Sequence, residues 1–316
     1  MPAYPKRYLG EILTNSSYYL RIYNACLSII TKKTGEPAEK LSLVDFGCGN
    51  GLLGIFAMQC GFKELIFIDT EKEFCDAVPV LAGALGFELK KDQIVCGGLK
   101  DIPSPLKIAN AITGTDVIEH IYSLPAFFEE LATYNASIVS VFTTASNCSN
   151  PLIVSRLKKM QLQDERQGLA ELNAQSKALH PSYFQMRKNI IRAAFPGLNE
   201  TTVESLAQKT RGMIEADIIE SVELYINKGI EPVPLSHPTN TCDPYTGSWT
   251  ENLVTIREYE KLYAENNFKL EVKTGFYNQW GKAVLKNILA WKMNIGIKIL
   301  GKTLAPFIIL AGEAKE

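Results

Sequence analysis

Histidine is scarce in this chain, and cysteine never occurs at a metal-binding spacing. The 316 residues contain three histidines, and the seven cysteines are odd in number, scattered and never spaced C-x-x-C. We therefore expect neither a disulfide framework nor a zinc ribbon, and the cysteines favour a reducing compartment. We expect no metal ion either: His237, Cys242 and Asp243 lie close in sequence, but they follow no established ligand spacing.

Long hydrophobic runs and an excess of one charge are also missing. No stretch reaches the roughly 18 uncharged apolar residues that a membrane span requires. The start, "MPAYPKRYLGEIL", lacks the basic-then-apolar layout of a secretory signal. With 33 basic and 34 acidic residues, the chain has no overall cationic field that would favour nucleic acid. We therefore expect a cytoplasmic enzyme with no transmembrane segment and no nucleic-acid partner.

Short apolar runs alternate with helical patterns between residues 41 and 145. The runs are "LSLVDF", "ELIFID", "DQIVCG", part of "ANAITGTDVIEHI", and "ASIVSVFTT". This alternation is typical of a parallel sheet with helices on both faces. Strand character returns at "FKLEVKTGF" and "PFIILAGE". The pattern predicts an α/β fold: a Rossmann-like, doubly wound, mostly parallel seven-stranded sheet.

A long helical insertion interrupts this sheet in the sequence. Residues 147–255 have mainly helical patterns followed by a proline-rich loop, and we expect them to form a substrate-binding lid between strands five and six. Residues 41–146 and 256–316 would form the sheet domain. Residues 1–40 are expected to form an N-terminal helical cap, with one helix over 8–33.

Three glycines follow the first predicted strand, in "VDFGCGNG". Glycine permits positive φ and lets the main chain approach a ligand closely, and ligands of open parallel sheets bind at the carboxyl ends of strands. Asp69 ends the next predicted strand, 22 residues beyond Gly47 (69 − 47), where a carboxylate can accept ribose hydroxyls. A dinucleotide fingerprint needs a third glycine where Leu52 stands, so an NAD(P) enzyme fits less well. The alternative without a ligand is an ordinary tight turn.

Three segments together resemble the motifs of class I S-adenosylmethionine-dependent methyltransferases. They are "VDFGCGNG", "FIDTE" and "TGTDVIEHIYSLPAFFEEL", and the likeness is greatest to the small-molecule O-methyltransferase branch that includes ubiquinone-biosynthesis enzymes. The resemblance covers roughly residues 40–146, with a weaker match over 265–312. It implies S-adenosylmethionine as the cofactor, S-adenosylhomocysteine as its product, and methyl transfer by in-line displacement.

The resemblance also implies a set of cofactor-binding residues. They are Asp45, Gly47, Cys48, Gly49, Gly51, Asp69, Thr70, Leu99, Asp116 and Val117. By this resemblance Asp45 would bond the amino group of the cofactor directly or through water, Asp69 would hold the ribose, and Asp116 would face the sulfonium and the substrate. The family often has an acidic residue after the third strand, but here the stretch is "VCGGLKD". Leu99 or a main-chain group is therefore expected to contact the adenine, which Thr70 would flank.

Removal of a proton from the methyl acceptor favours histidine, because its pKa lies near neutrality. The candidates for a catalytic base are therefore His120, His180 and His237. His120 follows the fourth predicted strand, where it either braces the turn or transfers the proton. His180 and His237 each precede a proline in the insertion, and the alternative for both is an ordinary loop histidine.

Candidate substrate contacts come mainly from the insertion. They are Tyr19, Tyr183, Arg187, Arg211 and Trp249. Arg187 belongs to a basic helix that is either a solvated face or a clamp for an anionic group on the substrate. The aromatic residues would either cover a hydrophobic pocket or pack within the protein.

The C-terminal segment "GKAVLKNILAWKMNIGIKIL" has two interpretations. Lys282, Lys286 and Lys292 share an arc near Trp291, which is typical of an interfacial helix with peripheral membrane contact. Lys298 falls on the opposite side, so we favour a helix that covers the core.

Taken together, these patterns predict a methyltransferase that acts on a small molecule at oxygen, with nitrogen or carbon as alternatives. Two other functions remain open: an NAD(P)-dependent oxidoreductase, and a methyltransferase-like binding module without catalysis. The sequence leaves a homo-oligomer possible.

Overall fold

A computed structural model describes residues 1–103, 109–171, 178–233, 235 and 237–315 of the protein. The chain divides into two compact units. Unit 1 contains Met1–Ile118, Ser123–Asn150 and Thr255–Glu316, and unit 2 contains Glu119–Tyr122 and Pro151–Val254. The long segment of unit 2 has nearly the same bounds as the predicted insertion.

Unit 1 contains one seven-stranded sheet. Its strands are β1 (Ser42–Phe46), β2 (Glu64–Asp69), β3 (Ile94–Cys96), β4 (Ala111–Thr115), β5 (Val139–Thr144), β6 (Phe268–Thr274) and β7 (Ile308–Ala314). The order across the sheet is β3-β2-β1-β4-β5-β7-β6. Strands β1 to β5 pair in parallel, and β7 runs antiparallel to both β5 and β6. The predicted α/β fold with a mostly parallel seven-stranded sheet is confirmed.

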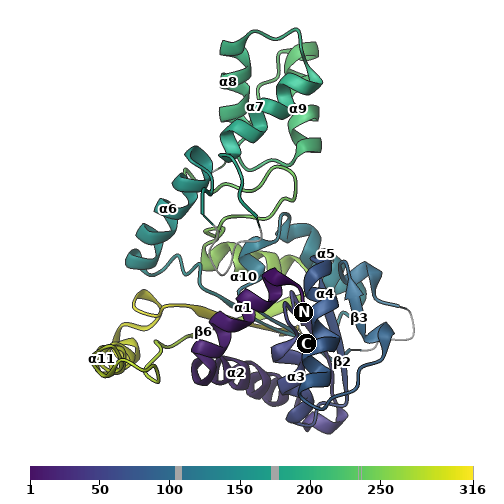
Figure 1. Cartoon of the computed structure of the whole chain (residues 1–316), viewed down its shortest axis with the longest axis vertical. Coiled ribbons are helices and arrows are strands. Elements are labelled where there is room, and N and C mark those ends of the chain that lie inside the picture. Colours follow the sequence, from purple (N-terminus) through teal and green to yellow (C-terminus); the bar gives the residue numbers. More distant parts are fainter. Residues whose placement is uncertain (104–108, 172–177, 234, 236, 316) are drawn as a thin grey trace. The chain divides into compact units, whose positions relative to one another are not determined.

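Helices flank the sheet of unit 1 (Figure 1). They are α1 (Ala3–Thr14), α2 (Ser16–Thr34), α3 (Leu52–Gln59), α4 (Lys72–Ala84), α5 (Leu124–Tyr134) and α10 (Ile256–Glu265). A further helix of unit 1, α11 (Val284–Leu300), lies apart from the sheet (Figure 1). Ile22, Cys26 and Ile30 of α2 belong to the same apolar cluster as Leu43 of β1 and Val141 of β5. Strands that are buried on both faces need continuous apolar runs, which explains the runs seen in the sequence.

The single helix predicted over residues 8–33 is wrong in its bounds. The structure has two helices that meet at Asn15, whose backbone leaves the helical conformation at φ −122°. Thr14, Asn15 and Ser16 explain the break, because such side chains compete with helical hydrogen bonds and favour caps. The side chain of Asn15 also accepts a hydrogen bond from Asn278 Nδ2 at 3.1 Å.

Unit 2 is mainly helical and has an apolar core of its own. Its helices are α6 (Pro151–Arg166), α7 (Tyr183–Ala194), α8 (Glu200–Lys209) and α9 (Glu215–Lys228). Helices α7, α8 and α9 lie side by side (Figure 1) around a cluster that includes Ile191, Leu206 and Val222. Ser182 and Asn199 cap the first turns of α7 and α8 through their side-chain oxygens. In the described part of the chain, no helix is both long and apolar enough to cross a bilayer.

Candidate cofactor site

The turn between β1 and α3 holds all three glycines of the motif in left-handed backbone conformations. The φ angles are 63° at Gly47, 52° at Gly49 and 76° at Gly51. The turn is fixed by backbone hydrogen bonds, because Cys48 N–H donates to Ile68 O at 2.9 Å and Gly51 N–H donates to Cys48 O at 2.8 Å. Residues with a side chain rarely adopt these angles, which accounts for three glycines at this spacing.

Only one of the three glycines would accept a Cβ without a close contact. A Cβ at Gly47 would lie 2.3 Å from Val117 Cγ2, and a Cβ at Gly51 would lie 3.0 Å from Val78 Cγ1. At Gly49 the nearest atom would be Tyr8 Cε1, at 3.5 Å, which is an ordinary contact. The packing of the turn itself therefore requires Gly47 and Gly51, and contact of the three glycines with a cofactor stays a prediction.

Asp69 ends β2 beside this turn and receives two backbone N–H groups. Gly49 donates to Oδ2 and Glu71 donates to Oδ1, each at 2.9 Å. Burial raises the pKa of Asp69, and the hydrogen bonds act in the opposite direction. A carboxylate offers about four lone-pair positions, so two remain for further donors. The hydrogen bond from Gly49 thus places a carboxylate that can accept a pair of hydroxyls beside the glycine turn. Thr70 follows Asp69 in an exposed position.

Asp45 lies beneath the turn. Its side chain is buried, with 2% exposure, and its Oδ2 accepts the Gly54 N–H of α3 at 2.8 Å. Burial raises the pKa of Asp45 to about 7, although the Gly54 N–H lowers it. The resemblance implied a bond from Asp45 to the cofactor; in this structure the carboxylate instead holds α3 against β1.

Asn50 is a site feature that the sequence reasoning missed. It is 1% exposed, and neither of its amide atoms has a hydrogen-bond partner within the described residues. An unsatisfied buried amide costs stability, so its retention needs a reason. The signal that was overlooked is a polar residue between two of the motif glycines.

An acidic side chain, Asp101, lies in the turn that follows β3. A short 3-10 helix, Leu99–Asp101, turns the chain back so that Asp101 Oδ2 accepts the Gly98 N–H at 2.8 Å. Gly97 N–H in turn donates to Asp69 O at 3.0 Å, so this turn adjoins the end of β2. Leu99 is 1% exposed and packs inside unit 1. This burial disfavours a side-chain contact of Leu99 with adenine, and the adenine contact stays a prediction.

The N-terminal helices bring tyrosines toward Asp116, which follows β4 with a positive φ of 52°. Burial raises the pKa of Tyr8, Tyr18 and Tyr19, and the Asp116 carboxylate raises all three further. Tyr8 also packs against Phe74, with ring centroids 5.5 Å apart. These phenols therefore stay protonated at neutral pH and serve as hydrogen-bond donors, not bases. Tyr8 was missed in the sequence, although tyrosines are dense at the N-terminus.

The three histidines are assigned to unit 2. His120 Nδ1 lies 2.7 Å from Trp249 O, and His180 Nδ1 lies 2.9 Å from Pro181 O. His180 also stacks on Tyr183 with a centroid distance of 5.0 Å. His237 is half-buried in the loop before Cys242. The catalytic role of all three stays a prediction. Among the described residues, no group of three or more His, Cys, Asp or Glu side chains is placed to hold a metal ion.

Arg187 is not exposed toward any substrate in this structure. Its side chain is 0% exposed; Nη2 contacts Glu165 Oε1 at 2.5 Å, and Nε–H donates to Ala207 O at 2.8 Å. Thr241 Oγ1 donates to the other oxygen of Glu165 at 2.7 Å. The substrate clamp predicted for Arg187 is therefore replaced by a role inside unit 2, where it connects α6, α7 and α8.

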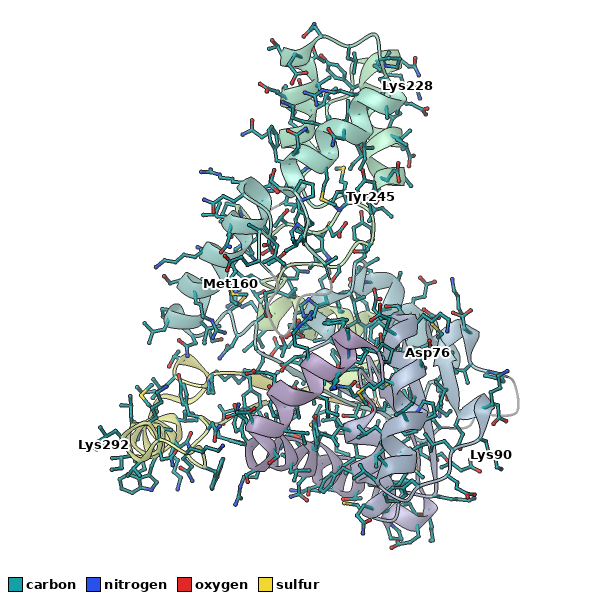
Figure 2. All side chains as sticks on the ribbon, viewed as in Figure 1. Asp76, Lys90, Met160, Lys228, Tyr245 and Lys292 are labelled. Atoms are coloured by element: carbon teal, nitrogen blue, oxygen red, sulfur yellow. The ribbon has the colours of Figure 1, made fainter. Side chains whose placement is uncertain are left out.

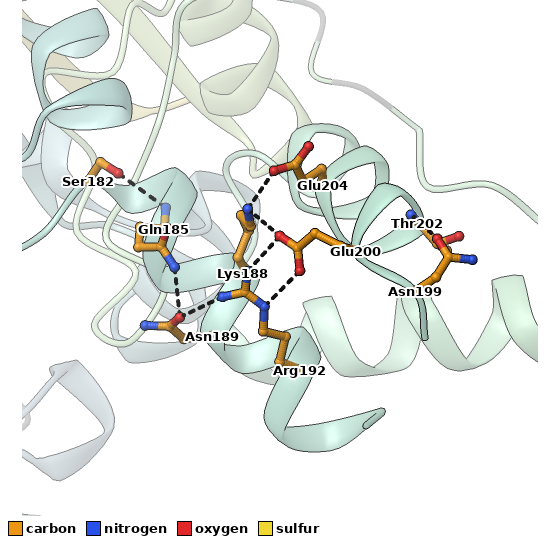
Figure 3. Close-up of polar contacts among 9 residues, drawn as sticks. All are labelled: Ser182, Gln185, Lys188, Asn189, Arg192, Asn199, Glu200, Thr202 and Glu204. Carbon is orange, nitrogen blue, oxygen red and sulfur yellow. Dashed lines mark hydrogen bonds and ion pairs between the residues drawn. The ribbon is translucent and has the colours of Figure 1, made fainter. Parts of the chain in front are cut away.

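The rest of the basic face of α7 is paired with acidic residues of α8. Lys188 Nζ contacts Glu200 at 2.6 Å and Glu204 at 2.7 Å, and Arg192 contacts Glu200 at 2.6 Å (Figure 3). Figure 3 shows these side chains pointing toward one another between the two helices. This arrangement favours the structural explanation of the basic residues.

The other predicted substrate residues lie in different surroundings. Tyr183 and Trp249 are buried in unit 2, where Trp249 Nε1–H donates to Tyr122 O at 3.0 Å. Arg211 is partly buried, burial lowers its pKa, and its Nε has no hydrogen-bond partner in the part of the chain that is described. Tyr19 lies in unit 1 with Tyr8 and Tyr18. Contact of these four residues with a substrate stays a prediction.

A separate groove of about 890 Å³ lies at the amino ends of the central strands. Leu41, Asn110 and Val139 line it, and they stand at the starts of β1, β4 and β5. Ligands of open parallel sheets bind beyond the carboxyl ends of the strands. The glycine turn and Asp69 lie at those carboxyl ends, so the groove is distinct from the candidate site.

Comparison with known proteins gives structural similarity alone. No protein-family model matches the chain, and no curated protein matches its sequence. A methyltransferase from Mesorhizobium loti, described as S-adenosylmethionine dependent, has 11% identity over 89% of this chain and 94% of its own, with a TM-score of 0.42. A geranyl diphosphate C-methyltransferase from Streptomyces coelicolor has 12% identity over 93% and 81%, with a TM-score of 0.43. A protein from Galdieria sulphuraria, described as a putative sarcosine dimethylglycine methyltransferase, has 10% identity over 93% and 85%, also with a TM-score of 0.43.

Proposed function

We propose that this chain is a methyltransferase that uses S-adenosylmethionine to methylate a small molecule at oxygen. The observation that carries the proposal is the hydrogen bond from Gly49 N–H to Asp69 Oδ2 at 2.9 Å. It joins the one motif glycine at which an added Cβ would meet no atom closer than 3.5 Å to a carboxylate with spare acceptor capacity. A nucleoside with a ribose and a charged amino-acid tail needs both features at neighbouring strand ends.

The strand order supports this choice over a dinucleotide enzyme. The usual dinucleotide-binding sheet has the parallel order 3-2-1-4-5-6. Here β7 lies between β5 and β6 and runs antiparallel to both. Leu52 also occupies the position of the third fingerprint glycine and begins α3. Both the sheet and the turn therefore depart from the NAD(P) pattern.

The residues of unit 1 fit the parts of such a cofactor. Asp69 would accept the ribose hydroxyls, Asp101 would lie at the adenine end, and the main chain at Gly49 would lie against the methionine part. The unpartnered amide of Asn50 would gain a polar partner there. When bound, the cofactor supplies a methyl group that is already activated for displacement. Asp116, which is exposed after β4, would face the acceptor and take up its proton.

A methyl group added at Gly49 tests the site. Gly49→Ala adds a Cβ that meets no protein atom closer than Tyr8 Cε1 at 3.5 Å, where the main chain would lie against the cofactor, so we expect the affinity for S-adenosylhomocysteine to fall at least about tenfold. Gly35→Ala is the matched control: Gly35 also has a positive φ, of 68°, and has no atom within 4 Å of an added Cβ. Both variants carry a similar backbone strain of roughly 1–2 kcal/mol.

The comparison separates lost binding from lost stability. We expect equal decreases in thermal stability for the two variants, with the affinity lost only in Gly49→Ala, as measured by calorimetric titration. Unchanged affinity in Gly49→Ala, or an equal loss in Gly35→Ala, would contradict the proposed site.

A further inference from the structure

Helix α11 exposes an unusual number of large apolar side chains. They are Val284, Leu285, Ile288, Leu289, Trp291, Ile295, Ile299 and Leu300. Leu285 and Ile299 are more than 80% exposed, and Trp291 is 54% exposed. Contiguous apolar surface of this kind marks an interaction site. The core-covering helix favoured from the sequence is therefore wrong, since only Ala290 and Ile297 of α11 are buried.

Two asparagines determine which face of α11 points inward. Asn294 Oδ1 accepts the Tyr277 N–H at 2.7 Å, and its Nδ2 donates to Tyr277 O at 3.1 Å. In the first turn of α11, Asn287 Oδ1 accepts the Gly281 N–H at 3.0 Å, and Asn287 Nδ2 donates to Gly281 O at 2.7 Å. Asn287 and Asn294 are seven residues apart and share a face with the buried Ala290 and Ile297. Because amide groups hold this face against the preceding loop, the apolar residues are left on the outside.

The exposed apolar side chains form the outer face of α11, and lysines lie at its borders and within it. At about 100° per residue, the exposed apolar residues cover roughly half of the helix circumference. Lys286 and Lys298 fall at the two borders of this arc, and Lys292 falls within it. Figure 2 shows Lys292 projecting away from α11. Long lysine side chains can lie along an apolar surface and keep the ammonium group in a polar layer.

The segment that contains α11 carries charge of one sign only. Residues 274–312 contain five lysines and no aspartate or glutamate, whereas the whole chain has 33 basic and 34 acidic residues. The five are Lys282, Lys286, Lys292, Lys298 and Lys302. A second copy of this face would bring lysines against lysines, which disfavours self-association. An anionic surface with an apolar interior would match both the charge and the exposed side chains.

We propose that α11 binds the surface of an anionic lipid bilayer and lies parallel to it, with its outer face in the interface. A helix of this kind gains from apolar burial and from attraction to acidic headgroups together. The inference goes beyond the methyltransferase proposal and does not depend on it, because it uses no residue of the cofactor site.

Vesicle sedimentation of the full chain tests this proposal. We expect binding to phosphatidylcholine vesicles that contain phosphatidylglycerol, weak binding to phosphatidylcholine alone, and release at high salt. The triple variant Lys286→Glu, Lys292→Glu, Lys298→Glu should lose on the order of 100-fold in partitioning, because each lysine near an acidic surface contributes about fivefold. Trp291 emission should shift to shorter wavelength on binding, and Trp291→Phe assigns that signal.

The matched control reverses three exposed lysines elsewhere in unit 1: Lys63, Lys90 and Lys91. It should bind vesicles like the parent protein, and both triple variants should keep their affinity for S-adenosylhomocysteine. Leu285→Ser with Ile299→Ser should weaken binding without lowering thermal stability, because both side chains are already exposed. Absence of binding to acidic vesicles, equal loss in the control, or a lipid-free dimer abolished by the serine variants would overturn the proposal.

Discussion

Replacement of Arg187 by alanine is expected to destabilise unit 2 by about 3–5 kcal/mol, the usual cost of removing one partner from a buried ion pair. Arg187 is 0% exposed, and its loss would leave the Glu165 carboxylate and the Ala207 carbonyl without their cationic donor. The effect should be local, since both partners belong to unit 2. Amide hydrogen exchange in α6, α7 and α8 measures it directly, as a matching fall in the free energy of opening.

Arg192→Ala is the control for this variant. Arg192 lies on the same helix and pairs with Glu200, but its side chain is 42% exposed, so its removal should cost less than about 1 kcal/mol. The substrate-clamp hypothesis makes the opposite prediction. An Arg187→Ala protein with unchanged exchange rates and a raised KM for the methyl acceptor would restore that hypothesis.

Asp45→Asn is expected to make unit 1 more stable than the parent protein at pH 8, but not at pH 4. The pKa of Asp45 is about 7 in the folded protein, against about 3.9 in an unfolded chain. Between these values the native state binds more protons than the unfolded state, so stability falls as pH rises through this window and levels off above pH 7. The difference of about three units between the two pKa values corresponds to a loss of at most about 4 kcal/mol in the free energy of unfolding.

Asparagine removes this titration and keeps an oxygen that can accept the Gly54 N–H. The measurement is hydrogen exchange of the β1 amides in both proteins, compared at the same pH from 4 to 8. Asp76→Asn, at an exposed aspartate paired with Lys72, controls for the removal of a negative charge. A constant difference between Asp45→Asn and the parent protein across this range would contradict the raised pKa.

Much of the fold follows from local patterns in the sequence. The central strands are short, buried and mainly apolar, and turn residues or helical periods separate them in the sequence. These signals act over a few residues, so the strands were predicted near their observed bounds. The outward face of α11 was only one of two interpretations of the sequence, because the choice depends on contacts with the loop around Tyr277.

The candidate site was predictable only in part, for a similar reason. The spacing of Gly49 and Asp69 is a sequence property, and the structure joins them by a hydrogen bond. The contacts of Gly47 with Val117, of Asp101 with Gly98, and of Arg187 with Glu165 depend on tertiary packing. Periodicity does not show which charged residues find a buried partner, so the sequence does not reveal the ion pair of Arg187 with Glu165.

Calorimetric titration of the intact chain with S-adenosylhomocysteine, with NADH in a parallel cell, tests the cofactor assignment most directly. We expect micromolar binding of S-adenosylhomocysteine, no binding of NADH, and a loss of at least about 100-fold in Asp69→Ala, which removes the acceptor for two ribose hydroxyls. Binding of NADH, or of neither ligand, would contradict the assignment and leave the glycine turn as a packing feature of the sheet.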